Sequence, residues 1–280
     1  MNLAYPVAAP DSSVPLMGFA GPFETNLDFI RQAGYTGVEL LVRNADELDI
    51  SRLESSLSNS GLTAVSFGTS PMLAQDKLDL LSEIEEIQEV TFQRTLRMIE
   101  LASRFQAPVG IGKLRGNLQE GTGRTAERRN KIFLKLCEYC EKVEGSIVME
   151  PQKYDNVNNL NTIDESLEWL RQINSKRLKL LVDTFHMDLT EKNQFDSIRR
   201  AARQIGFVHL SDTDRKAPGC GNIDFRAVLK AFSDIHYGGF LSMEIKQSPS
   251  SKEAAEICVK NLMSLTGQNW AKTYLSLIHI

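Results

Sequence analysis

Short runs of apolar, often β-branched residues alternate with longer runs of amphipathic spacing along the chain. This alternation is typical of repeated strand and helix pairs that build a parallel sheet. Eight strand-like runs are present, and because they are almost continuously apolar we expect strands that are covered on both faces. The predicted strands are residues 3–8, 37–42, 63–68, 108–113, 146–150, 178–183, 206–210 and 240–245.

The longer runs carry apolar residues at i, i+3, i+4 and i+7, which predicts helices that each bury one stripe. Several helix ends are marked in the sequence. Thr162 and Glu165 form a capping-box pattern, and Asp224 is suited to cap the helix that follows it. Gly34 and Gly61 stand where helices are expected to stop, since glycine adopts the left-handed backbone at low cost.

Parallel strand and helix pairs either close into a barrel or lie open as a doubly wound sheet. An open nucleotide-binding sheet is expected to have a glycine-rich turn after its first strand, and residues 9–13 contain no glycine. The pattern therefore favours an α/β protein with a closed (β/α)8 barrel, a fold of about 250 residues. We expect one domain over residues 1–272. Residues 273–280 form an apolar tail without an evident burial partner, either an oligomer contact or a read-through artefact.

Composition narrows the functional classes. A formal net charge of −4 and a pI near 5.7 argue against a nucleic-acid surface and a polybasic membrane anchor. The N-terminus has no basic segment followed by an apolar one, and no window has the roughly 18 apolar residues of a membrane span, so we expect a cytoplasmic protein. Four cysteines do not make a disulfide framework. Cys137 and Cys140 lie inside an amphipathic run, which indicates ordinary helix positions.

Candidate chemistry gathers at the ends of the last four predicted strands. In a (β/α)8 barrel the C-terminal strand ends form the active face. These four strands end in Glu150, Asp183, His209 and Glu244, at intervals close to one strand and helix repeat. Three carboxylates with one imidazole suit Mn²⁺, Mg²⁺ or Co²⁺. The alternative is that each residue is a separately paired structural group.

Longer motifs around these residues resemble a known family. They are Met149-Glu-Pro151, Leu181-Val-Asp-Thr-Phe-His-Met187 and His209-Leu-Ser-Asp-Thr-Asp-Arg215. They closely resemble the xylose-isomerase-like TIM-barrel family of sugar isomerases and epimerases. The nearest branch is that of the ketose and keto-acid 3-epimerases, typified by D-tagatose/D-allulose 3-epimerase and 5-keto-L-gluconate epimerase. The similarity covers nearly the whole chain.

This resemblance implies a role in carbohydrate metabolism and a set of site residues. Glu150, Asp183, His209 and Glu244 would bind one divalent ion, with Mn²⁺ as the first expectation. Glu150 and Glu244 would also remove and return the C3 proton of a ketose or keto-acid sugar, since epimerisation needs two opposed carboxylates. The ion would act as a Lewis acid on the enediolate between the two transfers. Dimers or tetramers built through the outer helices are usual for the family resembled.

By the same comparison, His186 and Arg215 resemble substrate contacts that hydrogen-bond the oxygens beside the reacting carbon. The alternative for His186 is a role in supporting a metal ligand, and the alternative for Arg215 is a pairing with Asp212 or Asp214. Lys113 and Arg115 lie at the end of the fourth predicted strand and suit a carboxylate or phosphate at the far end of a sugar. They equally suit a solvated loop. Glu39, on the second predicted strand, is a candidate for supporting a ligand.

One segment departs from the family pattern. Ketose epimerases typically read E-P-L-N-R-[YF]-E after the metal glutamate, whereas this chain reads Glu150-Pro-Gln-Lys-Tyr-Asp-Asn156. Asn156 stands in place of the second glutamate as a candidate substrate contact, and Tyr154 in place of the arginine. An amide keeps hydrogen bonding but removes a charge, so the substrate stays open.

Three rival functions follow. A metal-dependent lyase or dehydratase on a keto-sugar, keto-glycoside or keto-inositol would share the ion and the glutamate base. A DNA-repair endonuclease of the same superfamily needs a histidine-rich trinuclear zinc site, and this chain has four histidines. A non-catalytic sugar-binding barrel would not need paired glutamates at the strand ends.

Overall fold

A computed structural model describes residues 2–13, 17–119 and 123–267 as eight parallel strands that close into a barrel. The strands pair in sequence order, and β1 pairs with β8 to complete the closure. The predicted (β/α)8 barrel is therefore confirmed. The strands are β1 (Asn2–Ala8), β2 (Gly37–Leu41), β3 (Thr63–Gly68), β4 (Val109–Ile111), β5 (Ile147–Met149), β6 (Leu178–Asp183), β7 (Ile205–His209) and β8 (Phe240–Ser242).

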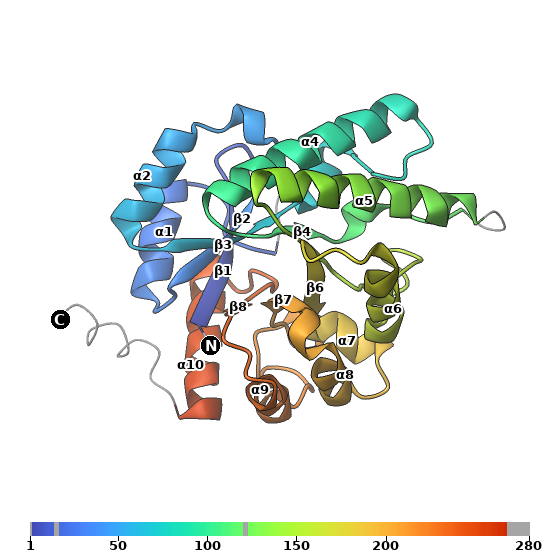
Figure 1. Cartoon of the computed structure of the whole chain (residues 1–280). Helices are drawn as coiled ribbons and strands as arrows, with labels where there is room; N and C mark the ends of the chain where they lie inside the picture. The colour runs from blue at the N-terminus through green and yellow to red at the C-terminus, as the bar shows by residue number, and fades with distance from the viewer. Residues whose placement is uncertain (1, 14–16, 120–122, 268–280) are drawn as a thin grey trace.

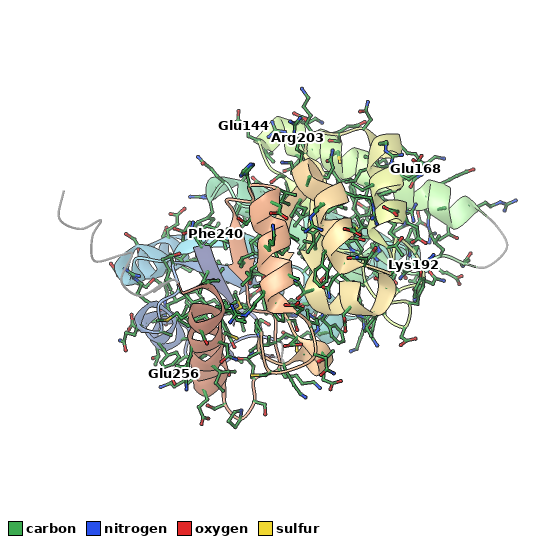
Figure 2. The ribbon with its side chains drawn as sticks, turned by 90° about the horizontal axis from the view of Figure 1, so that it is seen from below. Glu144, Glu168, Lys192, Arg203, Phe240 and Glu256 are labelled. Atoms are coloured by element: carbon green, nitrogen blue, oxygen red, sulfur yellow. The ribbon has the colours of Figure 1, made fainter. Side chains whose placement is uncertain are left out.

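Helices surround the barrel on its outer side (Figure 1). Charged side chains such as Glu168 and Lys192 point outward from the covering layer (Figure 2). No helix in the described ranges combines the length and apolar character that crossing a membrane requires. The helices are α1 (Phe23–Gln32), α2 (Ile50–Ser60), α3 (Ser70–Asp76), α4 (Glu85–Arg104), α5 (Arg124–Val143), α6 (Ile163–Ile173), α7 (Thr184–Thr190), α8 (Gln194–Ala201), α9 (Phe225–Asp234) and α10 (Ser251–Thr266).

Helix ends follow the signals in the sequence. Thr162 and Glu165 form the reciprocal capping box of α6. The Asp224 side chain accepts a hydrogen bond from Ala227 N at 3.1 Å at the start of α9. Gly61 ends α2 with φ of 67°, a left-handed conformation that favours glycine. Local capping chemistry therefore sets where these helices begin and end.

The barrel interior is divided between an apolar floor and a polar upper part. Side chains of five strands form a small cluster inside the barrel, made of Ala4, Val65, Val148, Leu181 and Phe207. The larger apolar core lies between the strands and the covering helices. The floor closes the barrel below the C-terminal strand ends, so polar groups at those ends lie over a dry base.

Four strands are shorter than predicted, β2 by one residue and β4, β5 and β8 by two or three. β4 ends at Ile111, so Lys113 begins the 3₁₀ turn η2 (Lys113–Arg115) instead of ending the strand. After β8, Glu244 N donates to Ser242 O at 3.2 Å, a tight turn that is incompatible with continued strand pairing. Glu150 directly follows β5, and the tight turn carries Glu244 out of the sheet.

The cysteine interpretation is confirmed within the described residues. Cys137 and Cys140 are both buried, unpaired residues of α5. Burial raises the pKa of the Cys140 thiol to about 12, which is opposite to the shift that a redox-active thiol needs. The apolar tail at 273–280 lies outside the described residues.

Candidate metal centre

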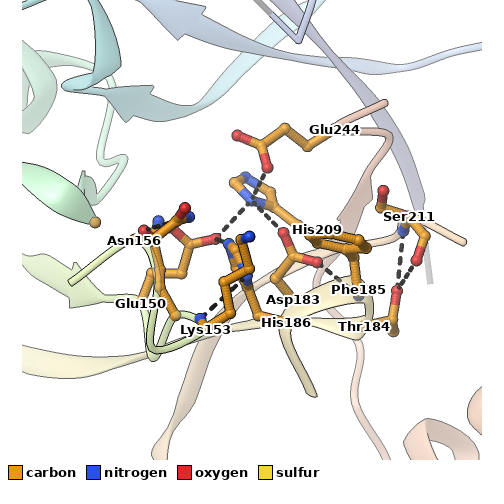
Figure 3. Close-up of polar contacts among 12 residues, drawn as sticks. Glu150, Lys153, Asn156, Asp183, Thr184, Phe185, His186, His209, Ser211 and Glu244 are labelled. Atoms are coloured by element: carbon orange, nitrogen blue, oxygen red, sulfur yellow. Dashed lines mark hydrogen bonds and ion pairs between the residues drawn. The ribbon is translucent and has the colours of Figure 1, made fainter. Parts of the chain in front are cut away.

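Four ligand-type side chains meet at the C-terminal mouth of the barrel. Asp183 and His209 are the last residues of β6 and β7. Glu150 directly follows β5, and Glu244 lies just after the end of β8. Each offers one ligand atom, and these four atoms lie within 4.8 Å of one another. The structure thus brings together all four residues that the strand-end pattern singled out (Figure 3).

The His209 ring lies at the centre of this group. Its Nδ1 is 3.5 Å from Glu150 Oε1, 3.8 Å from Asp183 Oδ2 and 3.5 Å from Glu244 Oε2. Its Nε2 lies 2.9 Å from Glu39 Oε2. The buried Glu39 carboxylate therefore holds the far side of the ring and turns Nδ1 toward the other three carboxylates.

The donor set fits a divalent cation. Glu150 Oε1 and His209 Nδ1 are buried and have no hydrogen-bond partner among the described residues. Buried polar atoms are almost always satisfied, so such a pair facing one point calls for a further partner. A cation bound there would supply it, and three carboxylates with one imidazole suit a hard to borderline ion.

The ionisable groups strongly influence one another. Burial opposes the charged form of His209, but the carboxylates of Glu39 and Glu244 outweigh it and raise the pKa of the imidazole well above its usual value. Burial likewise opposes ionisation of Glu150, yet the neighbouring imidazoles of His209 and His186 lower its pKa. For Glu244 burial dominates and raises the pKa. The two glutamates thus differ in their tendency to hold a proton.

Arg215 closes the other side of the centre. Its Nη1 donates to Asp183 Oδ2 and lies 2.9 Å from Glu244 Oε2, and its guanidinium stacks 4.5 Å above the Phe185 ring. The alternative from the sequence, a pairing of Arg215 with Asp212 or Asp214, is not found, because its guanidinium is paired with Asp183 and Glu244. Asp212 is occupied instead by backbone N–H groups, including those of Gly219 at 2.9 Å and Gly221 at 2.8 Å.

His186 lies in the first turn of α7, beside the metal ligands. Burial lowers the pKa of its imidazole, which favours the neutral ring. Its Nε2 accepts a hydrogen bond from Arg215 Nη2 at 2.9 Å. His186 and Arg215 therefore form one hydrogen-bonded pair at the edge of the ligand cluster.

The centre opens into a cavity of about 530 Å³ that His186, Arg215, Lys113 and Asn156 help to line. The predicted contact Arg115 is not part of that lining among the described residues. Its side chain is 0% exposed, and it donates to backbone carbonyls that include Glu150 O at 2.8 Å and Asn159 O at 2.8 Å. In a turn of about three residues, side chains two positions apart point in different directions. Lys113 consequently lines the cavity, and Arg115 braces the loops behind it.

Residues 27–262 match a family model described as the xylose isomerase-like TIM barrel. The chain belongs to this family. Among curated relatives, a D-psicose 3-epimerase of Enterocloster bolteae is 34% identical over 128 residues, which span 46% of this chain but only 42% of the relative. An L-ribulose 3-epimerase of Mesorhizobium japonicum is 28% identical over 226 residues, spanning 79% of this chain and 74% of the relative.

Solved structures share the fold at low sequence identity. An Escherichia coli 3-keto-D-glucoside 4-epimerase superposes with a TM-score of 0.80 at 15% identity, covering 94% of this chain and 99% of that one. An L-ribulose 3-epimerase superposes with a TM-score of 0.79 at 22% identity, covering 100% and 98%. These likenesses show the xylose isomerase-like barrel and its closure.

In this member of the xylose isomerase-like family, two polar residues extend the centre beyond its four ligands. Gln152 Nε2 donates to Glu150 Oε2, and Asn156 Nδ2 donates to Gln152 Oε1 at 3.2 Å. A carboxylate only accepts hydrogen bonds, so the amide orientation of Gln152 is fixed. A Cβ at Gly112 would lie 2.5 Å from Gln152 Nε2 and 2.6 Å from Glu150 Oε2, so only glycine leaves room for this contact.

Sequence reasoning missed Gln152 and also Lys77, which lines the cavity beside Lys113. Gln152 could have been found from its position, because it lies two residues after Glu150 in the segment that departs from the family pattern. Lys77 follows α3 in a left-handed conformation with φ of 57°. No periodicity marks such a position, so the sequence held no signal for it.

Proposed function

We propose that this chain is a divalent-metal-dependent epimerase of a keto sugar. One observation carries the proposal: Glu150 and Glu244 reach the same imidazole from different sides, each with an oxygen 3.5 Å from His209 Nδ1 (Figure 3). Two carboxylates around one point are what the removal and return of a proton on opposite faces of a carbon require. Relatives named as ketose 3-epimerases support the same reaction class.

Glu150, Asp183, His209 and Glu244 would hold the ion, and Mn²⁺ is the one we propose. When bound, the ion supplies Lewis-acid polarisation of the substrate carbonyl. Glu39 holds the His209 ring so that Nδ1 stays directed at the centre. The resident side chains thus keep the ligand atoms in place before substrate enters.

The proton transfers belong to the two glutamates. One carboxylate takes the C3 proton and becomes a carboxylic acid, while the electron pair moves toward the carbonyl. The other, protonated, glutamate delivers a proton to the opposite face of the same carbon, and the two exchange roles in the reverse direction. His186 and Arg215 line the cavity where they would hydrogen-bond the oxygens beside that carbon and stabilise developing negative charge.

A lyase or dehydratase is the second candidate, and the segment from Gln152 to Asn156 favours keeping it. By the resemblance, Asn156 stands where ketose epimerases typically have a glutamate, and its side chain donates to Gln152 Oε1. We infer that the pocket differs from that of the ketose epimerases resembled. If the substrate carries a leaving group next to the deprotonated carbon, the same abstraction gives elimination. The base and the ion would be shared between both reactions.

A single set of incubations tests both functions. Ketoses, keto-acid sugars and 3-keto glycosides are incubated with the Mn²⁺-loaded enzyme in deuterium oxide and followed by NMR. Deuterium at C3 together with a new epimer supports the epimerase, whereas loss of water or an aglycone supports the lyase. The Glu244→Gln variant should lose turnover while the exposed Glu256→Gln variant keeps it. Unchanged turnover in Glu244→Gln would sink the acid/base assignment.

A further inference from the structure

The cavity mouth has two chemically different sides. The four ligand-type residues of the candidate metal centre come from the β5 to β8 side. The other side is formed by the end of β2 and by segments that follow β3 and β4, where four apolar side chains line the cavity together with Thr69 and Ser70. The four apolar side chains are Leu41, Leu73, Ala74 and Leu114. These four side chains offer no hydrogen bonds to sugar hydroxyls, and Thr69 Oγ1 already donates to Gly110 O at 2.7 Å. This wall is therefore poorly suited to the polar end of a free ketose.

Two lysines lie on this apolar side. Lys77 follows α3, Lys113 begins η2, and α3 packs against η2. In the described part of the chain, neither ammonium has a carboxylate within 4.0 Å, and Lys77 Nζ donates to the backbone oxygen of Ala74 at 2.8 Å. The third cation of the cavity, Arg215, is by contrast paired with Asp183 and Glu244. The lysines therefore contribute uncompensated positive charge to one wall.

Nearby acids are already occupied. Asp76, which directly precedes Lys77, accepts from Arg43 Nε at 3.0 Å and from Arg94. Asp79 Oδ1 accepts from Leu81 N at 2.7 Å. The carboxylates closest in sequence to Lys77 thus have other partners, and both ammonium groups stay available to a ligand.

We propose that the substrate is a keto sugar that carries an anionic substituent, a carboxylate or a phosphate, bound between Lys77 and Lys113. The linking atoms would lie on the wall of Leu73 and Leu114. The cavity of about 530 Å³ has room for such an extension, because pockets of roughly 300–1,000 Å³ hold ligands larger than a free hexose. This inference rests on the proposed function, since the sugar is oriented by its reacting carbon at the metal centre.

The test compares neutral and anionic substrates of one skeleton. D-Fructose, D-fructose 6-phosphate and 5-keto-D-gluconate are assayed for deuterium exchange next to the carbonyl with Mn²⁺. We expect kcat/KM to favour at least one anionic substrate over D-fructose, with the phosphate and the carboxylate as separate arms. Each of Lys77→Met and Lys113→Met should lower the anionic-to-neutral ratio by about tenfold, the value of one charge-assisted hydrogen bond. Methionine keeps the length and apolar stem of lysine.

Lys176→Met is the matched control, because Lys176 is exposed and precedes β6 at the opposite end of the barrel. It should leave the ratio as in the parent chain. Equal kcat/KM for neutral and anionic substrates, or a ratio that Lys77→Met and Lys113→Met do not change, overturns the anionic subsite and leaves the proposed function standing. If no substrate exchanges, the proposed function fails. Calorimetric binding of D-fructose 6-phosphate to the parent chain and the double variant then decides the subsite without turnover.

Discussion

Glu39 fixes the orientation of the His209 ring at the candidate metal centre. It is 2% exposed, and its Oε2 accepts from Ser242 Oγ at 2.9 Å while lying 2.9 Å from His209 Nε2. A histidine ligand depends on such a partner for its tautomer and ring orientation. Glu39 stands in the middle of β2, away from the strand end, so its side chain supports the ring from inside the barrel.

Glu39→Gln tests this support. The substitution keeps the size of the side chain but removes the negative charge beside Nε2, so we expect Mn²⁺ affinity to fall by about 10- to 100-fold. Isothermal titration calorimetry on the metal-depleted protein measures the change. Glu256→Gln on α10 serves as the control for removal of one surface charge. Unaltered Mn²⁺ affinity in Glu39→Gln would show that His209 is oriented without the carboxylate.

Gln152→Leu tests the second residue-scale contact. Losing the amide donor frees Glu150 Oε2, whereas Glu150 Oε1 still faces the ligand cluster. We therefore expect kcat to fall by about 10- to 100-fold, as for a hydrogen bond to a charged group, with little change in Mn²⁺ affinity. Asn156→Leu removes only the partner of Gln152 and should have a smaller effect. Equal losses of kcat and metal affinity would mean that Gln152 acts through the ligand set as a whole.

At the scale of elements, the turn η2 couples the cavity to the loops behind it. Arg115 donates from one fully buried guanidinium to carbonyls of the turn and of the segments that follow β5. Burial lowers the pKa of this guanidinium to about 9, which leaves it protonated at neutral pH. The segment that carries Glu150 is thus held from behind by a buried cation.

Arg115→Met should accordingly destabilise the fold. Several buried carbonyls would lose their donor, at roughly 1–3 kcal/mol each, so we expect a loss of about 3 kcal/mol or more. A loss of that size lowers Tm by roughly 6–12 °C in a protein of this size class. Differential scanning calorimetry measures the shift, with Lys113→Met as the control because Lys113 is exposed in the same turn. Equal Tm values for the two variants would contradict a bracing role.

The same elements show which parts of the structure a sequence can predict. Periodicity and the run of strand-end ligands were sufficient for the closed barrel and for the cluster around His209, because parallel strands in sequence order must end on one face. Side-chain direction in the irregular segments was not predictable. Arg115 was expected in the cavity and braces loops instead, while Lys77 was unmarked and lines the cavity. The side-chain directions of both residues are set by contacts with segments distant in sequence, and a local sequence pattern does not reveal them.

At the scale of the whole molecule, the barrel mouth separates the four ligand-type residues from the wall that carries the two lysines. The β5 to β8 side supplies all four ligands, whereas the side with α3 and η2 supplies an apolar wall and two lysines. The apolar floor that contains Leu181 and Phe207 lies beneath both. Under the proposed function, we therefore expect changes in the α3 and η2 loops to alter substrate choice while the ligand-type residues stay fixed at the strand ends.

The charge state of His209 links the stability of the whole molecule to pH. The pKa of its imidazole is raised in the folded chain, so at neutral pH the fold retains a proton that the unfolded chain has released. Without an ion, this proton stabilises the fold fully below the unfolded pKa of about 6.5, and the contribution is lost as pH rises through the raised pKa. Ion binding has the opposite dependence, because a ligand nitrogen must give up its proton.

We therefore expect the difference in Tm between the Mn²⁺-loaded and the EDTA-treated protein to widen between about pH 6 and about pH 8. Below the raised pKa, apparent Mn²⁺ affinity should grow by up to about tenfold per pH unit for the one proton displaced. Differential scanning fluorimetry over a pH series measures the Tm difference, and proton release into two buffers of different ionisation enthalpy measures the stoichiometry. His209→Gln lacks the titrating group, so its smaller Tm difference should not follow the same pH course. A difference that stays flat or narrows as pH rises in the parent chain would show that His209 does not exchange its proton for the ion.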